Sequence, residues 1–430
     1  MAERDGIRNA TDQESRLRSF VLANVQRTLK PPNRMMKHPF IDPGSVYEGN
    51  LWDWDSYWAS YALLGILDGS SGPQRELRRQ CIEHVRGNVL NFLDYQLDDG
   101  YVPMMVQESD FPVPYLNRKH REGAVLNMHK PFLFQQVRLA SEASGDFQWA
   151  APLFDRLAAY LRHYERVYRS ASCGLYVWAD DVMIGNDNDP AVFGRPRFST
   201  AGMLLNGFMA AELSAAALIA GKLGRAEEEG RYRGAASALA AAVTAECWDQ
   251  RDGFFYSVDV DITTRAYDWF HKGLGVFWKT LPLKVRTWPG FLPLWNRTAT
   301  TAQAARLATH AADEATFWAP FGVTTLARDE KMFSLQPTIN PSNWLGPIWV
   351  VSNYIVFRGL LNYGHRDLAA ELCARTLALL GADLEKTGTL HEFYNPFTGE
   401  PIMNPGFLNW NMLALTMASE LRRETTESFG

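Results

Sequence analysis

Four carboxylates crowd into one short stretch of the chain, W-A-D-D-V-M-I-G-N-D-N-D-P-A-V-F-G-R-P-R, which runs from Trp178 to Arg197. The four are Asp180, Asp181, Asp187 and Asp189. Such a cluster is stable if one carboxyl group stays protonated, if Arg195 and Arg197 neutralise it, or if a metal binds. A carboxyl group that keeps its proton at neutral pH suits a general acid, and we follow that interpretation. The alternative is a solvated turn, since Asp, Asn, Gly and Pro are all turn formers.

Three other segments share the composition of this stretch, with Trp or Tyr alternating with Asp, Glu and Asn. They cover residues 47–58, 340–349 and 391–410. Sugars suit this mixture, because the faces of a pyranose ring stack on indoles while its hydroxyls bond to carboxylates and amides. In any one loop, Trp filling the top of a helical core and Asp capping a helix would explain the pattern equally well. Agreement among four loops favours a sugar site with the candidate binding residues Trp52, Asp53, Asp55, Trp178, Trp344, Trp349 and Trp410.

Helical patterns separate these loops and must position them. They cover residues 11–30, 54–67, 74–97, 122–143, 147–168, 200–223, 226–247, 267–280, 302–314, 345–363, 367–380 and 409–421. No linker divides the chain and no fixed sequence repeat recurs, which argues against a solenoid. Consecutive hairpins of this kind predict an all-α fold, an (α/α)6 barrel formed as one catalytic domain over residues 1–430. The polar loops before alternate helices would then meet at one face.

Composition narrows the class of protein. The 430 residues are 47% hydrophobic and carry a net charge of -5, which argues against nucleic-acid and membrane partners. Four separated cysteines predict reduced thiols and a cytoplasmic location. The N-terminus lacks an apolar signal core, and no run approaches the roughly 20 apolar residues of a membrane span. We expect a small-molecule partner and no cofactor, and leave open whether the protein is a homo-oligomer.

Two further motifs are more specific than the Asp cluster. They are N-W-L-G-P-I-W at residues 343–349 and E-F-Y-N-P-F-T-G at residues 392–399. Together with the 178–197 stretch, they resemble glycoside hydrolase family 63, in particular its short bacterial branch of glucosylglycerate and mannosylglycerate hydrolases. The resemblance implies an (α/α)6 barrel with Asp187, in G-N-D-N, as general acid and Glu392 as general base. Asn343 and Leu345 depart from the Tyr-Trp-Arg-Gly-Pro that is usual in the family.

The resemblance implies an inverting hydrolase, in which the acid protonates the leaving oxygen and the base activates water across a gap of about 6.5–9.5 Å. We expect Asp187 to keep its proton through burial against Trp178 and repulsion from the other Asp residues. Glu392 should be ionised, in wetter surroundings or among hydrogen-bond donors. Trp52, Asp53 and Asp55 would hold the sugar, with Trp344 and Trp349 as a wall. Arg195 or Arg197 would neutralise a glycerate carboxylate or, equally well, form salt bridges within the Asp cluster.

Several alternatives stay open. The preferred substrate is a 2-O-α-glycosyl-glycerate, and the alternative is a disaccharide or other α-glucoside. A non-catalytic sugar-binding protein is the competing class. A calcium loop is disfavoured because the EF-hand spacing is absent. An epimerase would need a His pair in the aromatic loops, and a terpene cyclase a complete Asp-rich motif on a helix; neither is present. For His129 and Lys130, which precede Pro131, a role at a helix N-terminus is preferred, and contact with the site is the alternative.

Overall fold

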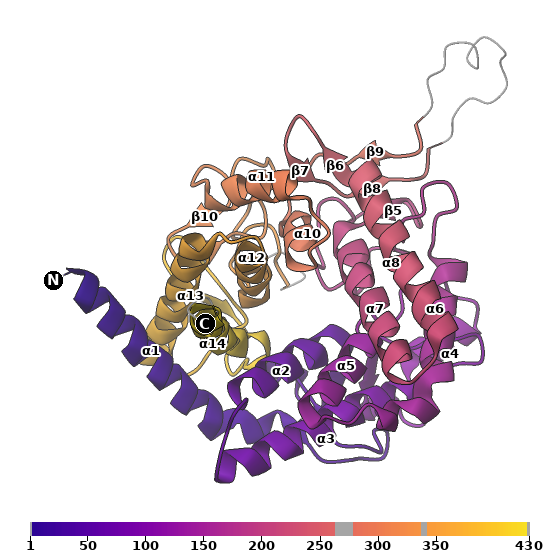
Figure 1. The fold of residues 1–430 in the computed structure, drawn as a ribbon, viewed down its shortest axis with the longest axis horizontal. Coiled ribbons are helices and arrows are strands. Elements are labelled where there is room, and N and C mark those ends of the chain that lie inside the picture. The colour runs from indigo at the N-terminus through magenta and orange to yellow at the C-terminus, as the bar shows by residue number, and fades with distance from the viewer. Residues whose placement is uncertain (1, 263–277, 337–341, 428–430) are drawn as a thin grey trace.

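The helices form two concentric rings around a central axis (Figure 1). The structure, a computed structural model, describes residues 2–262, 278–336 and 342–427. Within these residues the inner ring comprises α2 (Asp53–Ile66), α5 (Leu133–Ser144), α7 (Met203–Lys222), α10 (Leu292–Trp295), α12 (Val350–Asn362) and α14 (Leu413–Glu427). Each inner helix contacts the next in this order, and α14 contacts α2, so the ring closes. The outer helices are α1 (Ala2–Asn24), α3 (Pro73–Asp94), α6 (Phe154–Val167), α8 (Ala226–Cys247), α11 (Thr301–Ala312) and α13 (Arg366–Thr387). The predicted (α/α)6 barrel is confirmed.

Aromatic side chains fill the axis of the barrel. Trp58 of α2 is fully buried, and its ring lies about 6 Å from the rings of residues on four other inner segments. These are Phe132 at 6.0 Å, Phe208 at 6.2 Å, Trp295 at 5.9 Å and Tyr354 at 5.9 Å. Such offset and edge-on contacts are the favoured geometry for aromatic pairs. The inner helices therefore share one solid core.

Short strands fix the loops at one end of the barrel. β3 (Asn50–Trp52) pairs with β4 (Met105–Gln107), and β12 (Phe393–Tyr394) pairs with β13 (Pro401–Met403). Isolated bridges join Ile348 to Tyr394 and Gly44 to Phe407, so that segments far apart in sequence lie side by side. The other strands are β1 (Leu29–Lys30), β2 (Phe40–Ile41), β5 (Thr200–Ala201), β6 (Trp248–Asp249), β7 (Phe254–Phe255), β8 (Val258–Asp259), β9 (Leu281–Pro282), β10 (Trp318–Ala319) and β11 (Gly322–Val323).

Two predicted helices begin later than expected. The pattern at 122–143 becomes helical only at α5, after the short α4 (Tyr115–Arg121) and an extended segment that ends at Pro131. Proline disfavours helical conformation in the residue before it, so Lys130 stays extended. The pattern at 345–363 becomes helical only at α12, because Gly346 (φ 147°) and Pro347 precede it. Most of the helix predicted at 267–280 lies outside the described residues.

One helix departs from the expectation about membrane segments. By length and mean hydropathy α7 qualifies as a membrane span, contrary to the sequence-based expectation, but 83% of its most apolar window is buried inside the fold. Core helices of soluble proteins meet the same criteria. The inner ring therefore accounts for the apolar character of α7.

A glycine on α3 allows the segment before the first site loop to lie against that helix. A Cβ atom on Gly87 would come 1.8 Å from the carbonyl oxygen of Pro39. Next to it, Asn88 Oδ1 accepts the backbone N–H of Ile41 at 2.9 Å, and Asn91 Oδ1 accepts that of His38 at 3.0 Å. The helix thereby fixes the segment that leads toward Tyr47.

We expect Gly87→Ala to lower the free energy of unfolding by about 1–3 kcal/mol or more, because the methyl group overlaps backbone that must move. Gly234→Ala on α8 is the matched control, since nothing lies within 4 Å of its Cβ position. There, helix propensity should stabilise the protein by up to about 1 kcal/mol. Urea unfolding of both variants checks this, and equal effects would contradict the close approach.

Candidate active site

A small cavity lies where the N-terminal ends of the inner helices meet. Its volume is about 100 Å³, below the roughly 300–1,000 Å³ of pockets for drug-sized ligands. Of the residues predicted to form the site, the cavity is lined by Trp52, Asp55, Asp187, Trp344, Trp349, Glu392 and Trp410. The other lining residues are Tyr47, Trp54, Lys130, Met183, Gly185 and Ser342. The four loops singled out in the sequence therefore meet at one place.

Asp187 comes from the loop between α6 and α7. Burial raises the pKa of its carboxyl group, while hydrogen bonds from Ser342 and Gly185 and the charge of Lys130 act in the opposite direction. Repulsion from the neighbouring Asp residues is not among the causes of the raised pKa, so that part of the expectation is wrong. Burial alone favours the protonated form that a general acid requires.

The next residue ties this loop to the Trp motif. Asn188 Oδ1 accepts the backbone N–H of Trp344 at 2.7 Å, and its Nδ2 donates to Asn343 Oδ1 at 3.1 Å. The Trp349 indole N–H donates to the carbonyl of Asn343 at 2.8 Å. Asn343, which replaces the Tyr usual in the family that the sequence resembles, therefore links the loop that carries Asp187 to the Trp motif.

Glu392 lies at the start of the β12–β13 hairpin, where its backbone N–H donates to Met403 O at 3.0 Å. Tyr47 OH donates to the Glu392 carboxylate at 3.1 Å, and Asn404 Nδ2 donates to its other oxygen at 2.5 Å. Burial raises the pKa of Glu392 to about 7, against the lowering effect of these two donors. Of the two surroundings expected for Glu392, water or hydrogen-bond donors, the structure shows the donors, since the residue is only 3% exposed.

The two carboxyl groups influence each other. The charge of Asp187 contributes to the raised pKa of Glu392. Both charges, together with that of Asp55, contribute to the raised pKa of Tyr47, although burial is its largest cause. A negative charge on Asp187 therefore favours the protonated form of Glu392, and the protonation states of the two groups are linked.

Two further carboxylates at the start of α2 have different environments. Asp55 lines the cavity, and burial raises its pKa well above the usual range, with the charge of Asp53 adding to the effect. Its Oδ1 accepts a hydrogen bond from Asn409 Nδ2 at 2.6 Å. Asp53 is fully buried behind the cavity and pairs with Lys130 at 3.0 Å. Asp55 is therefore placed to meet a ligand, whereas Asp53 supports the wall.

Indoles form much of the cavity wall. Trp344 and Trp349 stack at 3.8 Å between ring centroids, and Trp349 stacks in turn on Phe393 at 4.6 Å. Trp54 lies edge-on to Trp410 at 5.4 Å. Rings held by their neighbours offer a rigid apolar surface for the C–H face of a sugar.

Four predicted binding residues do not line the cavity: Asp53, which lies behind its wall, and Trp178, Arg195 and Arg197. The Trp178 indole lies against Gly202, where an added Cβ would come 2.5 Å from its Nε1 atom. Arg195 forms an ion pair with Asp259. Arg197 has 61% of its side chain exposed and lies 3.8 Å from Asp180. Of the two roles left open for the arginines, the structure shows a salt bridge within the Asp cluster for Arg197 and one outside it for Arg195.

The other members of the Asp cluster organise the loop itself. Asp180 Oδ1 accepts the backbone N–H of Val182 at 3.0 Å, and Asp181 accepts that of Gly194 at 2.7 Å. Asp189 accepts from Ala191 at 2.9 Å. Three of the four carboxylates thus stabilise turns of this loop, although Asp189 is buried rather than solvated, and of the four only Asp187 lines the cavity.

Sequence reasoning missed several lining residues. Tyr47 and Trp54 lay inside a loop that had been singled out, so composition alone could have included them. A helix N-terminus was the preferred place for Lys130, but its side chain lines the cavity and pairs with Asp53 at the start of α2. Ser342 and Met183 also lay inside singled-out stretches, but neither residue is one of the aromatic, acidic or amide types on which the prediction was based.

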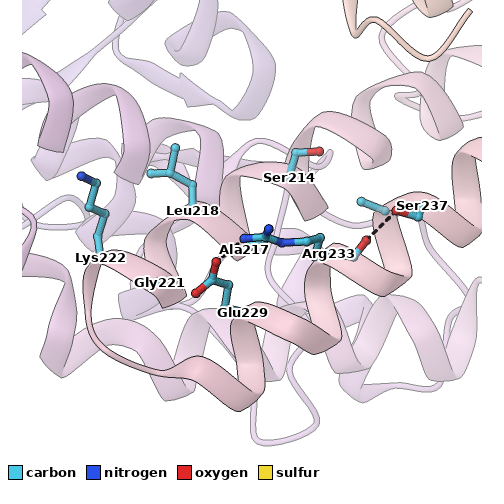
Figure 2. Close-up of a pocket in the computed structure, with 9 residues that line it drawn as sticks. Ser214, Ala217, Leu218, Gly221, Lys222, Glu229, Arg233 and Ser237 are labelled. Carbon is cyan, nitrogen blue, oxygen red and sulfur yellow. Dashed lines mark hydrogen bonds and ion pairs between the residues drawn. The ribbon is translucent and has the colours of Figure 1, made fainter.

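Larger hollows elsewhere lack these features. The one between α7 and α8, shown in Figure 2, measures about 650 Å³ and is lined mainly by small residues. Its charged groups include Glu229 and Arg233, which pair with each other. Among the described residues, no group of three or more His, Cys, Asp or Glu side chains is arranged to hold a metal ion.

Comparison with known proteins identifies the family. Residues 75–410 match the profile of the mannosylglycerate hydrolase MGH1-like glycoside hydrolase domain. The chain belongs to this family. The resemblance predicted from the motifs is thereby confirmed.

Individual relatives cover parts of the chain. A mannosylglycerate hydrolase of Thermus thermophilus is 31% identical over 38% of this chain and 32% of its own length. A mannosylglycerate hydrolase of Selaginella moellendorffii is 26% identical over 42% of this chain and 31% of its own. The matching segments thus span about a third of these relatives.

Solved structures share the fold along most of the chain. The family 63 mannosylglycerate hydrolase from Thermus thermophilus, in complex with glucose, superposes with a TM-score of 0.67 at 21% identity, covering 93% of this chain and 99% of that one. Neutral trehalase from Saccharomyces cerevisiae gives a TM-score of 0.58 at 16% identity over 91% and 76%. At these identities the likeness concerns the barrel.

The hydrogen bond from Tyr47 to Glu392 predicts a pH effect. We expect Tyr47→Phe to raise the pKa of Glu392 above its value of about 7, because a donor to the ionised form is lost. For any reaction that needs ionised Glu392, kcat/KM should then fall more at pH 6 than at pH 8. Tyr363→Phe is the control, since its hydroxyl bonds to Ala299 O, away from the cavity. A pH profile with the same shape in Tyr47→Phe and the wild type would count against this role.

Proposed function

We propose that the protein is an inverting α-glycosidase of small substrates, with Asp187 as general acid and Glu392 as general base, in one domain formed by residues 1–430. The observation that carries the proposal is that both carboxyl groups line one small cavity walled by indoles, Glu392 being buried and Asp187 partly exposed. Four larger hollows among the described residues lack this combination of paired acids and stacked indoles.

The proposed reaction follows from the two carboxyl groups. Asp187 gives its proton to the glycosidic oxygen as the bond to the anomeric carbon breaks. Glu392 takes a proton from water, whose oxygen bonds to the opposite face of that carbon, so the configuration inverts. The water proton ends on Glu392 and Asp187 is left ionised, and exchange with solvent restores both. Tyr47 and Asn404, which donate to Glu392, favour its ionised form at the start.

The preferred substrate is a 2-O-α-glycosyl-glycerate, glucosylglycerate or mannosylglycerate. Support comes from the relatives named mannosylglycerate hydrolases. Arg195 and Arg197 no longer support an anionic aglycone, since neither lines the cavity. An α-glucosidase acting on disaccharides is the second candidate, because the carboxylates and indoles of the cavity suit a hexose whatever its aglycone.

A hydrolysis panel tests the proposal. Glucosylglycerate, mannosylglycerate, kojibiose and trehalose are supplied in turn, and the anomer of the released sugar is followed by NMR. Release of the β-anomer from an α-linked substrate is the expected result. Release of the α-anomer would overturn the assignment of Glu392 as base. Binding without turnover of any substrate would favour the sugar-binding protein.

Removing either acid should abolish most turnover. We expect Asp187→Asn and Glu392→Gln each to lower kcat by about 10²–10⁴-fold, the usual contribution of general acid–base catalysis. Asp181→Asn is the isosteric control from the same loop, because Asp181 bonds to Gly194 and does not line the cavity. Comparable losses in all three variants would show that the effect is structural.

A further inference from the structure

Lys130 is a buried cation in the wall of the cavity. Its side chain is 3% exposed, and its Nζ lies 3.0 Å from Asp53 Oδ1. Its own backbone N–H donates to Asp53 Oδ2 at 2.7 Å, so the one carboxylate is held at both oxygens by the one residue. The ammonium group also lies 5.9 Å from the centre of the Trp54 ring. A charge this deeply buried is stable only when it is paired, and Asp53 supplies the partner.

The backbone around Lys130 is fixed by an outer helix. Tyr160 OH donates to Lys130 O at 2.9 Å, and Tyr164 OH donates to His129 O at 2.8 Å. Both tyrosines belong to α6 and are buried. The extended conformation before Pro131 is therefore held from outside the barrel, which aims the Lys130 side chain inward.

The loop that carries Asp187 lies directly on this lysine. Lys130 Nζ donates to Met183 O at 3.3 Å. Two residues on, the Cβ position of Gly185 would lie 3.4 Å from Lys130 Cε and 3.1 Å from the Trp54 ring. A side chain at 185 would press against both residues and would be strained by the positive φ of 92°. Lys130 and Trp54 thus form the platform on which the segment from Met183 to Asp187 is seated.

The charges around this platform are unequal. Among the described residues that line the cavity, Lys130 is the one basic side chain, whereas Asp55, Asp187 and Glu392 are acidic. The other titratable groups that face these residues are Asp53, Tyr47 and His129, and burial lowers the pKa of His129 to about 4, so it is neutral near pH 7. The Lys130 charge lowers the pKa of both Asp187 and Asp55 against the effect of burial.

We propose that Lys130 is a positioning residue for the general acid. Its ammonium group holds the Met183–Asp187 segment against the start of α2. Its positive charge favours release of the proton from Asp187. The inference rests on the proposed function, since it assigns Lys130 a role in the chemistry of that same site. An acid that held its proton too strongly would transfer it slowly to the leaving oxygen, so a nearby cation matches acid strength to the working pH.

The test is the pH dependence of kcat/KM in Lys130→Gln, Lys130→Arg and the wild type. An opposite charge within about 4–6 Å lowers a carboxyl pKa by about 1–3. A reaction that needs one protonated and one ionised carboxyl group has its pH optimum at the mean of their two apparent pKa values. Removing the lysine charge raises the sum of these values for the Asp187–Glu392 pair, and the optimum rises with it. We therefore expect the optimum of Lys130→Gln to rise by about half a pH unit or more. Lys130→Arg keeps the charge, so its optimum should stay at the wild-type value even where kcat falls.

A variant of opposite sign guards against failure of Lys130→Gln to fold. Asp53→Asn removes the partner that neutralises Lys130, so the lysine charge acts more strongly on Asp187 and the optimum should fall. An optimum that is unchanged in Lys130→Gln, that moves equally in Lys130→Arg, or that rises in Asp53→Asn overturns the proposal. If the wild type releases the β-anomer but the variants do not show these shifts, only the role of Lys130 is refuted. A wild type without glycosidase activity would refute the proposed function itself.

Discussion

Carboxyl groups gathered in a small cavity walled by indoles are the constraint around which the rest of the site is arranged. Taking a carboxylate out of water is costly, so such groups must be protonated, hydrogen-bonded or paired with a cation. All three solutions occur within one wall: burial favours protons on Asp187 and Glu392, donors surround Glu392, and Lys130 pairs with Asp53. The charge of each group affects the pKa of its neighbours, as Asp187 does for Glu392 and Lys130 does for Asp187, so the protonation states of the site depend on one another.

The barrel supplies the rigidity that this arrangement needs. Trp58 and its aromatic neighbours fill the axis below the cavity, so the starts of the inner helices cannot move independently. Above them the loops are tied to one another by Asn188 and by the bridge from Ile348 to Tyr394. Catalytic groups far apart in sequence are thus carried by elements that share one core and one set of loop contacts.

The sequence predicted what depends on periodicity and motif. Helical spacing identified most helices and the double ring, and failed where Pro131 and Pro347 keep the chain extended before a helix. The aromatic loops were found, and most of their selected residues line the cavity. One sequence does not show which charged groups become neighbours in the folded chain. Arg195 lies near the Asp cluster in sequence, yet it pairs with Asp259. Lys130, for which a helix N-terminus was the preferred place, instead lines the cavity and pairs with Asp53.

The stacked indoles of the cavity wall have an optical consequence. Trp344 and Trp349 are nearly parallel, with an interplanar angle of 10°, and the rings of Trp54 and Trp410 lie within 6 Å of one or the other. Electronic transitions of chromophores held so close mix, and they respond to the polarity of whatever touches them. These indoles therefore act as an intrinsic spectroscopic probe of the cavity. Near-ultraviolet circular dichroism or intrinsic fluorescence could follow its occupancy by colourless, unlabelled compounds, independently of turnover.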